Sequence, residues 1–137
     1  MRSREYLLSI FCLKTVEDAQ KIRRQLEHMH NIVLIGDGFV NLELAFSLAS
    51  PTWHITLLKR MNRILQRTVS PDISAYLSQQ TEEVGILILC NQQVEKVAGN
   101  TGLITGVITN PGESLHADSW IVAIGSNPDT TLAEPVQ

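Results

Sequence analysis

The stretch Asn31–Ala49 reads NIVLIGDGFVNLELAFSLA and contains three local patterns in a fixed order. Asn31–Ile35 is a short apolar run rich in branched residues, as in a parallel strand that is buried on both faces. Gly36 and Gly38 interrupt this run. Val40–Ala49 then places apolar residues at helical spacing. The stretch therefore predicts a strand, a glycine turn and a helix.

This order is typical of the first unit of a dinucleotide-binding fold. Gly36 allows a tight turn, and Gly38, which has no Cβ, lets a pyrophosphate approach the backbone. The following helix presents unpaired N–H groups and the positive end of its dipole to the anion. Asn41 stands where the G-x-G-x-x-G/A pattern has its third small residue, so we expect either a wider gap between helix and strand or a side chain turned aside. An ordinary tight turn without a nucleotide remains an alternative.

The composition indicates a single globular domain. The chain has 137 residues, of which 44% are hydrophobic and 18% are charged, with a net charge of −3. These values disfavour disorder and give no basic surface for nucleic acid. No apolar run has the length of a membrane span, and we expect no signal peptide and no membrane partner. Cys12 and Cys90 form no C-x-x-C pair, which is typical of thiols in a reducing compartment such as the cytoplasm.

A second strand is predicted over His54–Leu58, and basic residues follow it. In dinucleotide-binding folds the residue that ends this strand faces the adenosine ribose. An acidic residue there selects NAD, whereas nearby cations accommodate the 2′-phosphate of NADP. Here the strand ends in Lys59 and Arg60, with Arg63 and Arg67 beyond. This favours NADP over NAD as the cofactor, and a solvated basic loop is the alternative.

The remaining elements complete an α/β fold. Thr15 and Asp18 indicate the start of a helix over 16–28, and Ser70-Pro71-Asp72 starts another. The buried face of this second helix is expected to comprise Ile73, Tyr76, Leu77 and Val84. Apolar runs predict strands over 86–89, 94–98, 103–109, 114–117 and 120–124. We expect a Rossmann-like parallel sheet with helices on both faces and a small antiparallel β-meander. Residues 1–14 would be a lead-in segment and residues 15–137 a single dinucleotide-binding domain.

Three stretches resemble the NAD(P)H-binding domain of FAD-dependent pyridine nucleotide-disulfide oxidoreductases. They are Leu13–Ala19, Val33–Ala45 and Ala117–Asp129. The similarity is strongest to the ferredoxin, rubredoxin and putidaredoxin reductase branch, which lacks the active disulfide. In a full-length parent enzyme, the resemblance implies hydride transfer from NAD(P)H to FAD and electron transfer to a small iron–sulfur protein. The segments with which members hold FAD are not found in this chain. We therefore expect it to bind a nucleotide and, alone, not to catalyse.

The resemblance also implies which residues bind the cofactor. Glu43 matches the acidic residue near the nicotinamide end. Lys59 stands where NAD-using members have Glu, and Arg60 where NADP-using members often have Arg. Gly125 would let the final strand approach the nicotinamide ribose. No catalytic and no metal-binding residue is expected. The expected cofactor-binding residues are Gly36, Asp37, Gly38, Phe39, Val40, Asn41, Glu43, Lys59, Arg60 and Gly125.

Two other functions are compatible with the sequence. Asn41 motivates a degenerate Rossmann-like fragment without a cofactor, which would act as a self-associating interaction module. The surface that meets the FAD domain in the family would be exposed, so we expect a homo-oligomer unless an FAD domain covers it. An independent dehydrogenase is disfavoured, because no Tyr-x-x-x-Lys pair or metal cluster is present. His28 and His30 are expected to be solvated, and His116 and Asp118 to lie at a turn.

Overall fold

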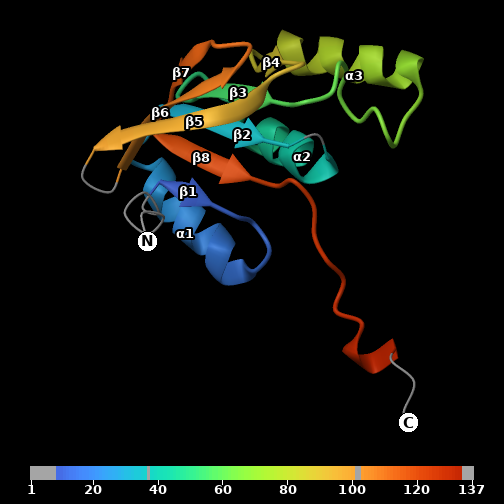
Figure 1. Cartoon of the computed structure of the whole chain (residues 1–137), viewed down its shortest axis with the longest axis horizontal. Coiled ribbons are helices and arrows are strands. Elements are labelled where there is room, and N and C mark those ends of the chain that lie inside the picture. Colours follow the sequence, from blue (N-terminus) through green and yellow to red (C-terminus); the bar gives the residue numbers. More distant parts are fainter. Residues whose placement is uncertain (1–8, 37, 101–102, 134–137) are drawn as a thin grey trace.

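The computed structural model describes residues 9–36, 38–100 and 103–133, and it contains two sheets (Figure 1). The larger sheet has five parallel strands in the order β1-β8-β2-β3-β4, and the smaller has three antiparallel strands in the order β5-β6-β7. The parallel strands are β1 (Ile10–Phe11), β2 (Asn31–Ile35), β3 (His54–Leu58), β4 (Leu87–Leu89) and β8 (Ser119–Val122). The antiparallel strands are β5 (Gln93–Asn100), β6 (Leu103–Asn110) and β7 (Ser114–His116). The helices are α1 (Val16–Leu26), α2 (Phe39–Leu48), α3 (Pro71–Glu83) and the short 3₁₀ helix η1 (Thr131–Ala133).

The parallel sheet separates two hydrophobic cores, because successive side chains of a strand point to opposite faces. In β2, Ile32 and Leu34 belong to the core formed with the helices. Val33, between them, belongs to the core formed with β6, where it packs with Ile104 and Val107. The molecule is therefore layered as helices, parallel sheet and antiparallel sheet, with β5 and β6 crossing the parallel strands (Figure 1).

The predicted α/β class, the parallel sheet and the antiparallel meander are confirmed. The expectation of helices on both faces is wrong for the described residues. The helical residues that join a core cluster all contribute to the same one, on one face of the sheet. The antiparallel sheet takes the second face instead, because its alternating apolar residues can cover Val33, Leu58 and Trp120.

The predicted helix starts are present with their capping interactions. Thr15 Oγ1 accepts a hydrogen bond from the Asp18 N–H at 3.2 Å, and Asp18 Oδ2 accepts one from the Thr15 N–H at 3.1 Å. This reciprocal pair satisfies two N–H groups that have no partner within helix α1. Ser70 Oγ accepts from the Ile73 N–H at 3.4 Å, and Pro71 occupies the first turn of α3.

The predicted buried face of α3 is wrong except at Leu77, which is partly buried and packs against the core formed with the helices. Ile73 and Tyr76 are 49% and 61% exposed, and Val84, just after the helix, is also exposed. The helix buries Ser74 and Thr81 instead. Their hydroxyls are satisfied locally, since Ser74 Oγ donates to the Ile64 carbonyl and Thr81 Oγ1 to the Leu77 carbonyl, each at 2.6 Å. Short side chains with their own acceptors thus line the inner face of α3 together with Leu77, whereas Ile73 and Tyr76 point outward.

The register of the parallel strands brings their carboxyl ends together. Ile35 pairs with Leu58 of β3 on one side and with Val122 of β8 on the other. At the opposite end, Asp118 Oδ2 accepts hydrogen bonds from the His30 and Asn31 N–H groups at 3.0 and 2.8 Å. The turns that follow β2, β3 and β8 consequently lie next to one another.

The edge strand β1 extends the sheet beyond β8. Ile10 pairs with Trp120 and Phe11 with Ile121, so this part of the expected lead-in segment contributes to the sheet. After β8 the chain continues in an extended segment that ends in η1 (Figure 1). Within the described ranges, no helix combines the length and the apolar character that a membrane crossing requires.

Candidate functional site

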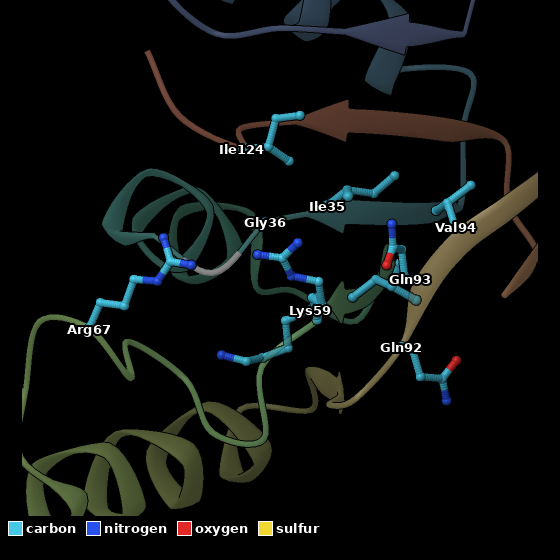
Figure 2. Close-up of a pocket in the computed structure, with 10 residues that line it drawn as sticks. Ile35, Gly36, Lys59, Arg67, Gln92, Gln93, Val94 and Ile124 are labelled. Atoms are coloured by element: carbon cyan, nitrogen blue, oxygen red, sulfur yellow. The ribbon is translucent and has the colours of Figure 1, made fainter. Parts of the chain in front are cut away.

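A cleft of about 360 Å³ opens at the carboxyl ends of β2 and β3 and beside the start of β5 (Figure 2). This volume lies within the range of small-molecule sites, and ligands of open α/β sheets bind at this end of the strands. The lining residues are Ile35, Gly36, Leu58, Lys59, Arg60, Arg67, Gln92, Gln93, Val94 and Ile124.

Gly36 closes one side of the cleft in a conformation that other residues rarely adopt. Its φ is +136°, and its N–H donates to the Leu58 carbonyl at 3.1 Å. A Cβ at this position would lie 2.1 Å from the Ala123 carbonyl oxygen. The fold therefore requires glycine here, both for the backbone angle and for the close approach of β8.

Gly38 is a glycine that the packing does not require. It is the N-cap of α2 with φ −99° and ψ 174°, and a Cβ there would have no heavy atom within 4 Å. Among the described residues, no side chain caps the first turn of α2, and that turn contains no acidic residue. The helix N-terminus at Gly38 thus presents backbone N–H groups and the positive end of its dipole, which suits an anion. Asp37, between the two glycines, lies outside the described residues.

Asn41 is not turned aside, because its side chain is completely buried in the contact between α2 and the turn. Its Nδ2 lies 2.8 Å from the point that a Cβ on Gly36 would occupy. Neither Nδ2 nor Oδ1 has a hydrogen-bond partner among the described residues. Buried amide groups are nearly always hydrogen-bonded, so this pair of atoms is exceptional.

Two of the cations that follow β3 hold the loop in place. Lys59 is only 2% exposed, and its ammonium group donates to the Arg63 carbonyl. Arg63 donates in turn from Nη1 to the Val69 carbonyl at 3.0 Å and from Nη2 to the Gln66 carbonyl at 3.1 Å. These bonds shape the loop that spans residues 60–69.

The other two cations line the cleft with exposed side chains, whereas Lys59, which also lines it, is buried. Arg60 and Arg67 are exposed. Figure 2 shows Arg67 reaching out of the loop after β3, whereas the Lys59 amine points back toward that loop. The sequence analysis noted Arg67 as a nearby cation without including it among the expected cofactor-binding residues. Its separation from Arg60 in the sequence gave no sign that both reach one cleft.

Several expected site residues lie outside the lining of the cleft. Phe39 and Val40, in the first turn of α2, are each 46% exposed, and Glu43 is exposed further along the helix. Gly125 follows β8 with a φ of +127° and is also exposed. Its neighbour Ile124 lines the cleft and is 76% exposed, although the sequence analysis did not select it.

Gln92, Gln93 and Val94 form the wall that the start of β5 contributes, and no sequence motif marked them. Gln92 is held by the antiparallel sheet. Its Nε2 donates to Glu113 Oε2 at 2.6 Å, and Thr109 Oγ1 donates to its Oε1 at 2.8 Å. The second sheet therefore fixes this wall of the cleft.

The other polar groups noted in the sequence have surroundings that indicate a structural role. Burial would raise the pKa of Asp118, but the hydrogen bonds from Asn31 and His30 outweigh burial and lower it. Burial raises the pKa of the Cys90 thiol, although the nearby Lys59 charge opposes this effect. His28 and His30 are exposed. In the part of the chain that the structure describes, no three His, Cys, Asp or Glu residues are grouped as metal ligands.

The fold and the cleft define a Rossmann-like α/β domain with a cleft at the carboxyl ends of its parallel strands. The chain belongs to the pyridine nucleotide-disulphide oxidoreductase family, whose model matches residues 7–137. The resemblance inferred from the sequence is thereby confirmed.

Known proteins of this family are similar to the chain over most of its length. It is 36% identical to putidaredoxin reductase CamA of Pseudomonas putida over 88% of the chain and 29% of that protein. It is 30% identical to rhodocoxin reductase of Rhodococcus erythropolis over 93% of the chain and 30% of that protein. A covalent putidaredoxin reductase–putidaredoxin complex matches with a TM-score of 0.84 and 35% identity, over 91% of this chain and 30% of that one. The chain thus spans about 30% of the length of these relatives.

Proposed function

We propose that the chain is the NAD(P)H-binding domain of a flavin-dependent oxidoreductase. The observation that carries this proposal is the open N-terminus of α2 at Gly38, which lies beside a cleft lined by two exposed arginines. A dinucleotide has a diphosphate for the helix N-terminus and an adenosine ribose for the basic side of the cleft.

The cleft suits NADPH better than NADH. The 2′-phosphate of NADPH would be held by Arg60 and Arg67, whose guanidinium groups can form paired, charge-assisted hydrogen bonds with phosphate oxygens. Lys59, which the sequence analysis also assigned to this role, already donates its ammonium group to the Arg63 carbonyl. The cation that ends β3 would therefore support the loop instead of contacting the ribose.

The chemistry resides in the cofactors, and this chain would bind and orient one of them. NADPH supplies a hydride, which a flavin accepts. Ile124 gives the cleft an exposed apolar lining residue. Glu43 lies exposed on the outer side of α2, where an FAD domain of a longer polypeptide would meet it. By analogy with putidaredoxin reductase, the parent enzyme would pass electrons to a small iron–sulfur protein.

Calorimetric titration of the 137-residue chain with NADPH, NADH and FAD tests this proposal. The key variant is Gly38→Ala, because a Cβ at Gly38 meets nothing in the fold but projects where the anion must approach. We expect wild type to bind NADPH more tightly than NADH and not to bind FAD. Gly38→Ala should keep its thermal stability and lose at least about tenfold in affinity. Failure of wild type to bind either nucleotide at millimolar concentration would refute the proposal.

The second candidate is a degenerate domain that retains the fold without the cofactor and acts as a self-associating module. The observation in its favour is Asn41, whose side chain fills the contact that a small residue occupies in nucleotide-binding members. The same titration separates the two functions. Absence of binding together with a defined oligomer would support the module, and nucleotide binding at micromolar concentration would exclude it.

A further inference from the structure

Lys59 has an unusual environment for a lysine. Its side chain is only 2% exposed, although the residue is one of those that line the cleft. Lysine is almost never fully buried unless its ammonium group is paired. Here the ammonium group donates a hydrogen bond to the Arg63 carbonyl, four residues further along the chain. The charge of Lys59 is therefore directed to the backbone of the loop 60–69.

The hydrogen bond from Lys59 begins a series that reaches the residues around Arg67. Arg63, whose carbonyl accepts this bond, donates from its guanidinium group to the carbonyls of Gln66 and Val69, at 3.1 and 3.0 Å. These two residues lie on either side of Arg67 in the chain, and Arg67 is exposed and lines the cleft. Figure 2 shows the Lys59 amine pointing toward the loop from which Arg67 extends. The conformation that presents Arg67 thus depends on hydrogen bonds that begin at Lys59.

The backbone of Lys59 is bonded to a different wall of the cleft. Its N–H donates to the Leu89 carbonyl at the end of β4, and its carbonyl accepts from the Gln92 N–H, each at 3.0 Å. The Asn91 N–H donates to the Met61 carbonyl at 3.0 Å and joins the same two segments a second time. Lys59 therefore links the loop after β3 with the wall to which Gln92 belongs.

We propose that Lys59 is a positioning residue that sets the preference of the cleft for NADPH, because its buried ammonium group holds the loop 60–69 in the conformation that presents Arg67 to the 2′-phosphate. This inference rests on the proposed function. In dinucleotide-binding folds, the residue that ends this strand usually selects the cofactor by contact with the ribose. In this chain the same position acts through the loop, because the ammonium group is bonded to the Arg63 carbonyl.

A positioning role and a direct contact predict different results when Lys59 and Arg67 are changed together. If Lys59 acts by presenting Arg67, its removal has no further effect on NADPH binding once Arg67 is absent. If the Lys59 ammonium group contacts the phosphate itself, the two losses of affinity add. A double-mutant cycle measures this difference, because residues of one network give non-additive effects.

The experiment compares wild type, Lys59→Met, Arg67→Ala and the double variant by titration with NADPH and NADH. Methionine keeps a flexible apolar side chain and removes the ammonium group. We expect Lys59→Met to bind NADPH about tenfold more weakly and NADH within about twofold of wild type. Its Thr68 and Val69 amides should exchange faster with solvent. The double variant should bind NADPH as weakly as Arg67→Ala does. Lys96→Met, at an exposed position of β5 outside the lining of the cleft, is the matched control and should behave as wild type.

A measurement on wild type keeps the inference testable if Lys59→Met does not fold. The nitrogen resonance of the Lys59 ammonium group should shift no more with NADPH than with NADH. A shift with NADPH alone, additive losses in the double variant, or an equal loss of NADH affinity in Lys59→Met would overturn the positioning role and leave nucleotide binding intact. Unchanged NADPH affinity of Lys59→Met would do the same. Absence of NADPH binding by wild type would instead overturn the proposed function, and with it the preference assigned to Lys59.

Discussion

The role that we propose for Arg67 in ligand binding depends on its position in the fold more than on its charge. It is exposed and lines the same cleft as Arg60, although six residues separate the two. Arg63 lies between them in the sequence, and its guanidinium group donates hydrogen bonds to the Gln66 and Val69 carbonyls. At the residue scale, the chain thus uses neighbouring arginines for two purposes, one to shape a loop and the other to face a ligand.

Replacement of Arg67 by alanine should weaken NADPH binding and spare NADH. The variant removes a cation from the side of the cleft that we assign to the 2′-phosphate, a group that NADH lacks. Charge-assisted hydrogen bonds of this kind contribute roughly 1.5–3 kcal/mol, so we expect at least about a tenfold loss in NADPH affinity. Fluorescence titration with both nucleotides measures this effect. Arg24→Ala, at an exposed arginine of α1, is the control, and an equal loss for NADH would contradict the assignment.

Asp118 should make folding stability depend on pH below neutrality. Hydrogen bonds hold its pKa below the usual value of 3.8 in the folded chain. Its contribution is therefore complete above that value and is lost as the pH falls through the lower, folded-state pKa. Asp118→Ala should lower the free energy of unfolding by roughly 1–3 kcal/mol at pH 7. Urea denaturation from pH 7 to pH 3 should show the gap between variant and wild type narrowing below about pH 4. A gap that widens on acidification would contradict this assignment.

At the element scale, the loop 60–69 contains an unfavourable backbone conformation that its hydrogen bonds stabilise. Leu65 is buried with a φ of +51°, which is unfavourable for a branched residue. Its carbonyl accepts from the Thr68 and Val69 N–H groups at 2.9 and 3.0 Å. The Arg63 guanidinium donates to two further carbonyls of the same loop, those of Gln66 and Val69. The position of Arg67 in the cleft therefore depends on Arg63.

Arg63→Met should loosen this loop without removing a cleft residue. Methionine keeps the apolar length of the side chain and loses its donors, so the Gln66 and Val69 carbonyls lose their partner. We expect faster hydrogen exchange at the Thr68 and Val69 amides and a loss of about threefold to tenfold in NADPH affinity. Amide exchange followed by NMR, with the amides of β2 as internal reference, measures the first effect. Unchanged exchange in the loop would show that Arg63 does not hold it.

The elements differ in how far the sequence predicts them, and the reason is physical. The Ser70-Pro71 start of α3 is predictable because capping depends on adjacent residues. The orientation of α3 is not, because Ser74 faces the core through a carbonyl of Ile64, ten residues earlier in the chain. The cleft shows the same limit. The Gly36 turn is local, whereas the wall at Gln92 depends on Thr109 of β6 and on Glu113 in the turn before β7.

At the scale of the whole molecule, the outer surface of the helical layer is unusually apolar. Phe39, Val40 and Phe46 are each at least 38% exposed on α2, and Ile73 and Tyr76 are exposed on α3. A helix that is apolar on all sides is typical of a buried position, and exposed apolar patches often mark interfaces. The chain also spans only about 30% of the length of its relatives. A further domain or a second copy would cover these faces.

The isolated chain should therefore self-associate. Sedimentation equilibrium should give an average mass above the 15.3 kDa of one chain. The fraction of associated chains should rise with protein concentration. Phe46→Gln should lower the associated fraction, because Phe46 is 38% exposed on α2 and lies beyond the cleft. Lys21→Gln, at an exposed polar position of α1, should leave association unchanged. A monomer at all concentrations would show that the exposed side chains of α2 do not drive contact between copies. Nucleotide binding by such a monomer would still be possible, since none of these substitutions changes a residue of the cleft.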